Sequence, residues 1–268
     1  MPTNGTSARK RGRRPAHGEP VVDRALSLLA AFDAEHRALS LAELSRRTEM
    51  PPSSALRLAN RLVDWGALER DESGRFSIGL RLLEVATLAP RGHGLRHVAL
   101  PFMNDLAEVT RQHVQLAVRD GMQAMLVERL SSRHAAPVDY RIGGRLPLHS
   151  TGVGLVLLAF APLEVQEELL SRPVYSEPDN KLIPTDKLRR TLAEVRRERL
   201  AIFRRDDEHE SIVSVVAPVF GPDDTVPGVL GVLVPQRVAQ PRRLGLAVQT
   251  AALGISRELG ARRTVAIE

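Results

Sequence analysis

The sequence predicts an α+β fold in two parts, a small helical part that ends in a β-hairpin and a larger sheet domain with flanking helices. Three helix signals and a hairpin signal follow one another between residues 20 and 79. A leucine-rich linker helix is expected over residues 80–95. Over residues 96–268, strand-like runs and helices occur without strict alternation, which favours an α+β sheet domain.

The composition allows a folded core and removes several kinds of chemistry. The 268 residues are 43% hydrophobic, and no apolar run approaches the ~20 residues of a membrane span. Cysteine is absent, which excludes disulfides, thiol catalysis and cysteine-ligated metals. The first residues lack the apolar segment of a secretory signal. We therefore expect a cytoplasmic protein with no membrane partner.

A basic run opens the chain. The net charge is +6, and five of the six residues from Arg9 to Arg14 are lysine or arginine. Such a run is either a solvated, disordered tail or an arm that neutralises DNA phosphates. We expect residues 1–19 to be a disordered basic arm, with Arg11, Arg13 and Arg14 as candidate DNA contacts.

The next segment carries the start and stop signals of three helices. Apolar residues recur at helical spacing from Val22 onward. Ser40 followed by Glu43 is a capping-box pattern, which predicts a second helix from Leu41. Pro52 is well placed to begin a third helix, because proline is tolerated in a first turn.

The third helix, in "PPSSALRLANRLVDWG", has one apolar and one polar side. Its polar side carries Ser53, Ser54, Arg57, Asn60 and Arg61. This side is either an ordinary solvated face or the reader of a DNA major groove. Gly66 ends the helix, and "ALERDESGRFSIG" predicts a hairpin with Arg75 near its tip. Three helices and a hairpin within about 60 residues are typical of a winged helix-turn-helix; Ser40 and Arg75 complete its candidate contacts with double-stranded DNA.

A short helix crowded with leucines follows the hairpin. Leu80, Leu83, Val85 and Leu88 all fall within its first turns, and "APRGHG" interrupts the helical pattern before it resumes. Pro101 is expected to kink or to start the resumed helix. So many apolar side chains predict that the linker helix packs against another surface, for which a second copy of the chain is one candidate.

The sheet domain is predicted from a series of short apolar runs. In order, we expect two strands around Asp120–Gly121, a third in "VDYRIGGRLPLHS", a buried helix in "TGVGLVLLAFAP", helices over 162–170 and 185–200, strands in "AIFRR", "SIVSVVAPVF" and "VPGVLGVLVP", and a last helix over 238–262.

The stretch "RLPLHSTGVG" places a histidine and hydroxyls just before two glycines. His149 and Ser150 are neighbours in an extended segment, so they point to opposite faces and make a poor base–nucleophile pair. A phosphate loop of the Walker type is disfavoured because Leu155 stands where a lysine is needed. A small-molecule cup at a helix start and a tight turn without ligand both remain. We assign no catalytic residue, metal or cofactor.

In combination and in this order, several motifs resemble the IclR-type bacterial transcriptional regulators. They are "RALSLLAAF", "LSLAELSRRTEMPPSSALRL", "GRFSIGLRLLEVA", "GGRLPLHSTGVG", "EVRRERLAI" and "VVAPVF", and they span nearly the whole chain from Val21. The resemblance implies an N-terminal winged helix-turn-helix and a C-terminal GAF-like domain that binds a small organic effector. It also implies a homodimer or a dimer of dimers.

The resemblance further implies an effector pocket around the glycine loop. The candidate residues are Leu146, His149, Ser150, Thr151, Gly152, Val153, Gly154, Arg204, Asp206, Ile212, Ser214, Gly231 and Leu233. The amides of Gly152 and Val153 match positions that hold a carboxylate or another polar head. Departures from the family pattern, including Leu155 in place of a common lysine, suggest an aromatic or otherwise apolar acid as effector.

Two classes of function remain open. The first is a DNA-binding transcriptional regulator of a catabolic operon, controlled by the effector. The second is a GAF-like ligand-binding protein or enzyme with a vestigial helix-turn-helix. DNA affinity that falls steeply with salt distinguishes the first from the second.

Overall fold

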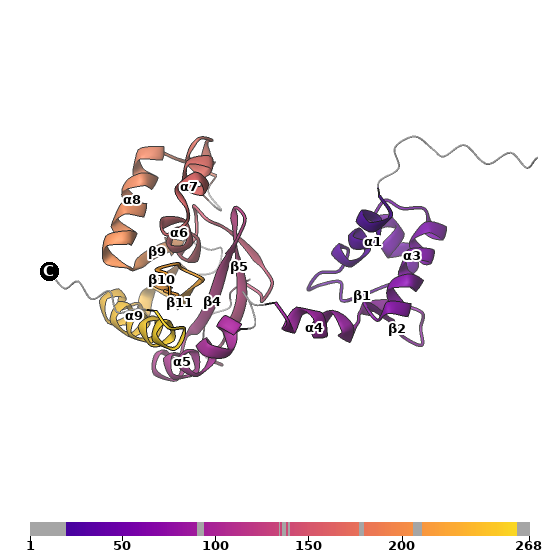
Figure 1. The fold of residues 1–268 in the computed structure, drawn as a ribbon, viewed down its shortest axis with the longest axis horizontal. Coiled ribbons are helices and arrows are strands. Elements are labelled where there is room, and N and C mark those ends of the chain that lie inside the picture. The colour runs from indigo at the N-terminus through magenta and orange to yellow at the C-terminus, as the bar shows by residue number, and fades with distance from the viewer. Residues whose placement is uncertain are drawn as a thin grey trace, which may run out of the picture. The chain divides into compact units, whose positions relative to one another are not determined.

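The structure is a computed structural model that describes residues 20–89, 94–133, 135, 138, 140–176, 180–205 and 211–261. By its internal contacts the chain divides into two compact units, Met1–Leu88 and Ala89–Glu268. Figure 1 shows the two units, which we describe separately. The predicted basic arm and Asp206 lie outside the described residues.

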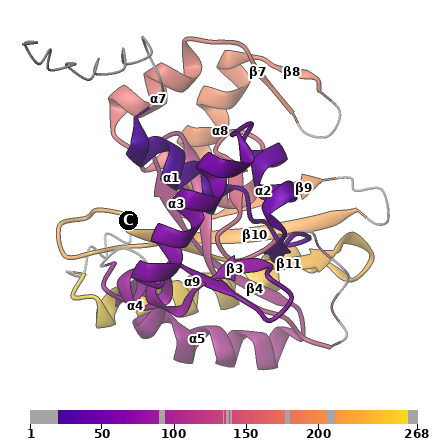
Figure 2. The same ribbon diagram turned by 90° about the vertical axis from the view of Figure 1, so that its right-hand side faces the viewer.

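The first unit has the predicted winged helix-turn-helix order. Its elements are α1 (Val21–Ala30), β1 (Ala38–Leu39), α2 (Leu41–Arg47), α3 (Pro52–Trp65), β2 (Leu68–Arg70), β3 (Phe76–Ile78) and α4 (Leu80–Thr87). The strands form an antiparallel sheet in the order β1-β3-β2, and α1, α2 and α3 lie together beside it (Figure 2). The sequence does not predict strand β1, because two residues are too short to show a period.

Local signals account for where these helices begin and end. The Ser40 hydroxyl accepts the N–H of Glu43, and the Glu43 carboxylate accepts the N–H of Ser40, so the predicted capping box is present. Gly66 ends α3 with φ +86, a left-handed conformation that suits glycine. The fully buried Phe76 of the hairpin joins Leu28, Leu44 and other helix residues in one core.

The second unit is built on a six-stranded antiparallel sheet in the order β6-β5-β4-β11-β10-β9. Its strands are β4 (His113–Asp120), β5 (Gln123–Leu130), β6 (Arg145–Pro147), β9 (Ala201–Arg205), β10 (Ile212–Val219) and β11 (Gly228–Pro235). The helices are α5 (Leu95–Thr110), α6 (Gly152–Ala159), α7 (Leu163–Leu170), α8 (Thr185–Glu198) and α9 (Pro241–Glu258). A separate small sheet pairs β7 (Val174–Tyr175) with β8 (Leu182–Ile183).

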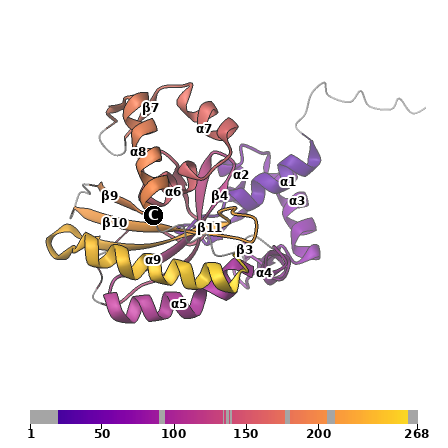
Figure 3. The ribbon, with the colours of Figure 1, turned by 60° about the vertical axis from the view of Figure 1, so that its left-hand side comes forward.

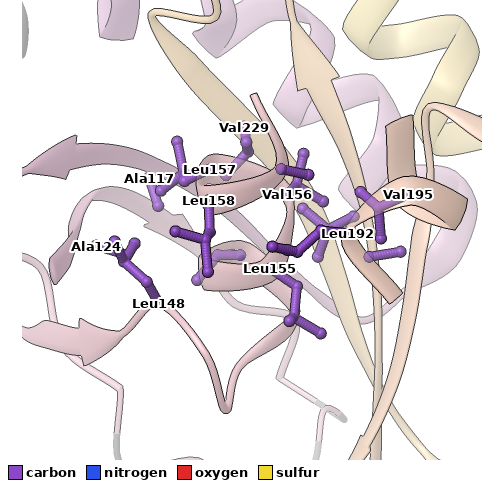
Figure 4. Packing of buried hydrophobic residues seen from close by; sticks show 14 of the residues in the cluster. Ala117, Ala124, Leu148, Leu155, Val156, Leu157, Leu158, Leu192, Val195 and Val229 are labelled. Carbon is purple, nitrogen blue, oxygen red and sulfur yellow. The ribbon is translucent and has the colours of Figure 1, made fainter. Parts of the chain in front are cut away.

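Each face of the six-stranded sheet has its own core. Helices α5 and α9 cover one face, and α6 and α8 lie over the other (Figure 3). All eight residues of α6 are buried, as its uniformly apolar sequence predicts. Figure 4 shows Leu155–Leu158 of α6 between sheet residues such as Ala117 and Val229 and the α8 residues Leu192 and Val195.

The structure corrects several predicted boundaries. Among the described residues of the predicted third run, only Arg145–Pro147 forms a strand. The last helix begins at Pro241 and ends at Glu258, within the predicted 238–262. Pro101 lies inside α5 and does not start it. Strands β7 and β8 have no sequence signal because each has two residues.

Helix α4 buries none of its residues within the described part of the chain. Leu80 and Leu83 are 70% and 62% exposed, Val85 is 49% exposed, and Leu88, just after the helix, is 79% exposed. Apolar faces of this kind are typical of surfaces that pack against a partner. Among the described helices, none is both long and apolar enough to cross a membrane.

Candidate functional site

The first candidate site is the outer face of α3. Ala55, Leu58 and Ala59 are buried in the core of the unit, which fixes how the helix is turned. Ser53, Arg57, Asn60 and Arg61 are exposed on the other side, and Ser54 is half-buried. Among the described residues, the side chains of Arg57 and Asn60 have no hydrogen-bond or ion-pair partner. Their donors are therefore free to reach base edges.

Two other predicted DNA contacts are held by neighbours within the unit. The Ser40 hydroxyl is 2.7 Å from Glu43 Oε2 and serves the capping box. Hydrogen bonds from Ser40, led by its backbone N–H, hold the pKa of Glu43 below its usual value. Arg75 donates to the carbonyl oxygen of Ala38 at 2.6 Å, which joins the hairpin to β1. Arg61 makes a long, exposed contact of 3.6 Å with Asp64.

The second candidate site is a pocket in the sheet unit, on the face covered by α6. Its lining residues come from β4, β6, β9, β10, β11, the start of α6 and the segment before β6: Gln115, Val138, Tyr140, Leu146, Thr151, Gly152, Val153, Phe203, Arg205, Ile212, Ser214 and Leu233. Seven predicted effector residues are therefore brought together. The sequence does not indicate the other five, which are Gln115, Val138, Tyr140, Phe203 and Arg205.

The glycine loop forms the pocket wall where α6 begins. Thr151 is the N-cap residue, and its hydroxyl accepts the N–H of Gly154 at 3.0 Å and donates to the carbonyl oxygen of Pro147 at 2.8 Å. The N–H groups of Gly152 and Val153 belong to the first turn, where a helix offers no carbonyl partner. These amides, at the positive end of the helix dipole, favour an anion.

The two glycines of this loop allow close packing. A Cβ on Gly152 would lie 2.5 Å from Ser214 Oγ, so α6 rests directly on β10. A Cβ on Gly154 would lie 2.3 Å from the carbonyl oxygen of Pro147. Gly154 thus shapes the loop and does not line the pocket.

Three polar atoms of the pocket have no hydrogen-bond partner within the described part of the chain. They are Gln115 Oε1, Ser214 Oγ and Arg205 Nε. Gln115 is 2% exposed and Ser214 is 6% exposed. Because unpaired buried polar groups are rare in folded proteins, such a cluster in a pocket indicates a place for a polar ligand.

Arg205 is held at the side of the pocket by Tyr140. Its guanidinium donates to the Tyr140 hydroxyl at 2.8 Å and lies 5.6 Å from the centre of the Tyr140 ring. Arg129 in turn donates to the backbone carbonyl of Tyr140, which fixes the segment that carries the ring. The arrangement leaves a half-buried positive charge facing a mostly apolar space.

Several predicted effector residues lie away from the pocket lining. His149 is bonded through Nε2 to the carbonyl oxygen of Tyr175 at 3.0 Å. Ser150 is buried with an unpaired Oγ but does not line the pocket. Arg204 pairs with Val213, whose side chain belongs to the opposite core, so Arg205 and not Arg204 faces the pocket.

Two further predicted positions affect the pocket only indirectly. Gly231 pairs with Gln115 and Val216, and a Cβ there would lie 2.9 Å from Val216 Cγ2. The sequence suggests that Leu155 makes the pocket more apolar. The structure instead places it in the core, with α8 residues such as Leu192.

Two of the pocket residues without a sequence signal, Phe203 and Arg205, follow from strand pairing. Ser214 pairs with Phe203 on β9 and with Leu233 on β11, and Ile212 pairs with Arg205. Directly paired residues share a face of the sheet. The predicted residues Ser214 and Ile212 therefore place Phe203 and Arg205 in the pocket once the register of β9 against β10 is known. The described ranges contain no group of three or more His, Asp or Glu side chains arranged to hold a metal.

Comparison with known proteins gives consistent matches over both units. A family model for the bacterial transcriptional regulator IclR C-terminal domain matches residues 88–257, and one for the IclR helix-turn-helix domain matches residues 21–72. The HTH-type transcriptional regulator KipR of Bacillus subtilis is 33% identical over 152 residues, which are 57% of this chain and 60% of KipR. XynR of Escherichia coli, also an HTH-type transcriptional regulator, is 27% identical over 89% of this chain and 96% of XynR.

Solved structures match over a similar length. The crystal structure of an IclR homolog from Microbacterium hydrocarbonoxydans, complexed with 4-hydroxybenzoate, has a TM-score of 0.83 and 31% identity, covering 90% of this chain and 99% of that one. A structure from Silicibacter sp. TM1040 has a TM-score of 0.74 and 25% identity, covering 92% of this chain and 98% of that one.

Proposed function

This chain belongs to the IclR family of bacterial DNA-binding transcriptional regulators, and we propose that a small organic acid held in the sheet-unit pocket controls its binding to operator DNA. The proposal places the protein in the cytoplasm, as a regulator of a catabolic operon. The observation that carries it is the pocket itself, where Gln115, Ser214 and Arg205 present unpaired polar groups inside apolar walls.

The chemistry of the pocket favours an acid with an apolar body. Positive potential comes from the Arg205 guanidinium and from the first-turn amides of α6. Phe203, Leu233 and the ring of Tyr140 offer apolar surface beside these groups. The related Microbacterium protein was crystallised with 4-hydroxybenzoate, an acid of this kind, which makes that compound a suitable first probe.

On DNA, we propose that α3 enters the major groove and that Arg57, Asn60 and Arg61 read bases or phosphates. Ser53 and Ser54 lie at the start of the same helix, the end that usually meets the bases. The basic arm, with Arg11, Arg13 and Arg14, adds phosphate contacts that do not depend on sequence. Arg75 on the hairpin and Ser40 at the start of α2 are the remaining proposed DNA contacts.

We propose that the regulator acts as a homodimer or a dimer of dimers. The exposed leucines of α4 are one apolar surface that a second copy would cover. A twofold dimer presents two reading helices to two half-sites about one helical turn apart.

Reciprocal binding measurements test the proposal. If an effector changes operator affinity by some factor, operator DNA must change effector affinity by the same factor. We would measure operator binding by fluorescence anisotropy with and without 4-hydroxybenzoate, and 4-hydroxybenzoate binding by calorimetry with and without operator. The two factors should agree, and operator affinity should fall steeply as salt rises.

A scrambled DNA duplex of equal length is the control. It should bind more weakly and show no dependence on the acid. Flat salt dependence and equal affinity for operator and scrambled DNA would contradict regulation. They would favour the alternative, a ligand-binding protein or enzyme with a vestigial helix-turn-helix.

A further inference from the structure

The pocket has two ends of different chemistry. Arg205 lies on β9, at one edge of the sheet, and Gln115 lies on β4, with β10 and β11 between them. Arg205 presents a charged donor, because its Nε has no partner among the residues that the structure describes. Gln115 presents an acceptor, because its Oε1, on a side chain that is 2% exposed, is also unpaired within that part of the chain.

The space between the two ends is largely apolar. Ile212 and Leu233 extend from the strands, Val153 from the start of α6, and Phe203 beside Arg205. A buried amide oxygen without a donor is unfavourable, and a ligand that supplies the donor removes that cost. A guanidinium whose free edge faces apolar walls selects a planar carboxylate, with which it forms strong charge-assisted hydrogen bonds.

Building on the proposed function, we propose that Arg205 and Gln115 read the two ends of the effector. The effector is then a carboxylic acid with an apolar body and a hydroxyl or amino group at the opposite end. Its carboxylate lies on Arg205, and its hydroxyl or amino hydrogen is donated to Gln115 Oε1. Arg205 carries a full charge, whereas the Gly152 and Val153 amides at the start of α6 offer only the partial charge of the helix dipole.

Three probes and two matched pairs of variants test this assignment. The probes are 4-hydroxybenzoate, benzoate, which lacks the donor, and 4-hydroxybenzamide, which lacks the negative charge. Arg205→Gln is compared with Arg204→Gln, a neighbour on the other face of β9. Gln115→Leu is compared with Gln112→Leu, whose Oε1 is also buried and unpaired but does not line the pocket.

Calorimetry on the full chain should give a distinct result for each pair. Arg205→Gln lowers affinity for both acids about tenfold or more and leaves the amide nearly unchanged, while Arg204→Gln has no such effect. Gln115→Leu removes the preference for 4-hydroxybenzoate over benzoate, and Gln112→Leu retains it.

Several outcomes would overturn the assignment. Acid binding that survives Arg205→Gln places the carboxylate elsewhere, for example on the α6 amides. Failure of the wild-type chain to bind any of the three probes rejects the ligand class. Salt-dependent operator binding is measured separately, and it tests the proposed DNA-binding function whether or not the ligand assignment holds.

If circular dichroism shows that Arg205→Gln does not fold, two other measurements test whether Arg205 binds the carboxylate. The wild-type chain must prefer 4-hydroxybenzoate to its amide, and Arg205→Lys, which keeps the charge, must retain part of that preference. Equal affinity for the acid and the amide would reject the assignment.

Discussion

Gly152 lies so close to Ser214 that a β-carbon on the glycine would stand 2.5 Å from the serine Oγ. The contact joins the start of α6 to the first half of β10, and both residues line the pocket. The shape of the pocket wall therefore depends on the absence of one side chain.

Gly152→Ala is expected to destabilise the sheet unit and to weaken effector binding. The added methyl group meets Ser214 and Val216 at 2.5–3.1 Å, and overpacking of this kind costs ~1–3 kcal/mol. Urea denaturation followed by circular dichroism measures the loss. Gly94→Ala is the control, because among the described residues no atom beyond its chain neighbours lies within 4 Å of the place its methyl group would take. Equal stability of the two variants would contradict the packing argument.

Arg57→Ala is expected to relax sequence discrimination on DNA. If the exposed guanidinium reads a base edge, its loss costs ~1–3 kcal/mol on the operator and less on scrambled DNA. Anisotropy titrations with both duplexes measure the ratio of affinities. Arg37→Ala, an exposed arginine before β1, should leave that ratio unchanged; an equal loss on both duplexes for Arg57→Ala would mean a phosphate contact.

Glu43→Gln is expected to change how the stability of the first unit depends on pH. The folded-state pKa of Glu43 is lowered from 4.5 by its hydrogen bonds with Ser40 and the charge of Arg75. The stabilisation from the ionised carboxylate is therefore fully present above about pH 4.5 and is lost as pH falls through the lower folded-state pKa.

The measurement is thermal unfolding of wild type and Glu43→Gln from pH 7 to pH 3. The variant should be less stable at pH 7, and the difference should shrink below about pH 4.5. Glu72→Gln, in the exposed hairpin turn, should differ little from wild type throughout. A difference in unfolding temperature between the two proteins that stays constant with pH would argue against the ionised capping box.

Leu83→Glu is expected to weaken self-association and, with it, operator binding. Leu83 is 62% exposed on α4, and a charge there would be buried without a partner in a dimer. Sedimentation velocity measures the shift toward monomer. Leu182→Glu, at a residue that is 59% exposed on β8, is the control and should leave the oligomeric state unchanged; an unaltered Leu83→Glu assembly would exclude α4 from the interface.

Local features of the chain are predictable from the sequence, and features set by strand pairing are not. The capping box of Ser40 and Glu43, the stop at Gly66 and the buried α6 all follow from patterns within one helix. Their physical causes act over three or four residues, so the sequence displays them directly.

The pocket residues depend on contacts that local patterns do not encode. The family resemblance favours Arg204, yet Arg205 lines the pocket, and this difference of one residue reverses the face of a strand. Gln115 lies beside the pocket through the pairing of β4 with β11, and Arg129 holds the backbone of Tyr140 in the segment before β6. Such long-range pairings leave no periodic signal near either residue.

The pocket combines a closely packed loop with side chains from separate strands, and this division is useful for the construction of biosensors. The loop around Gly152 and Gly154 is fixed by close backbone packing, whereas most side chains that would touch a ligand project from separate strands. Positions such as Phe203, Ile212 and Leu233 are thus suited to combinatorial mutagenesis, with the loop kept constant. Libraries built on this scheme would change which compound controls a reporter gene. The DNA-binding unit, and therefore the operator that it binds, would stay the same.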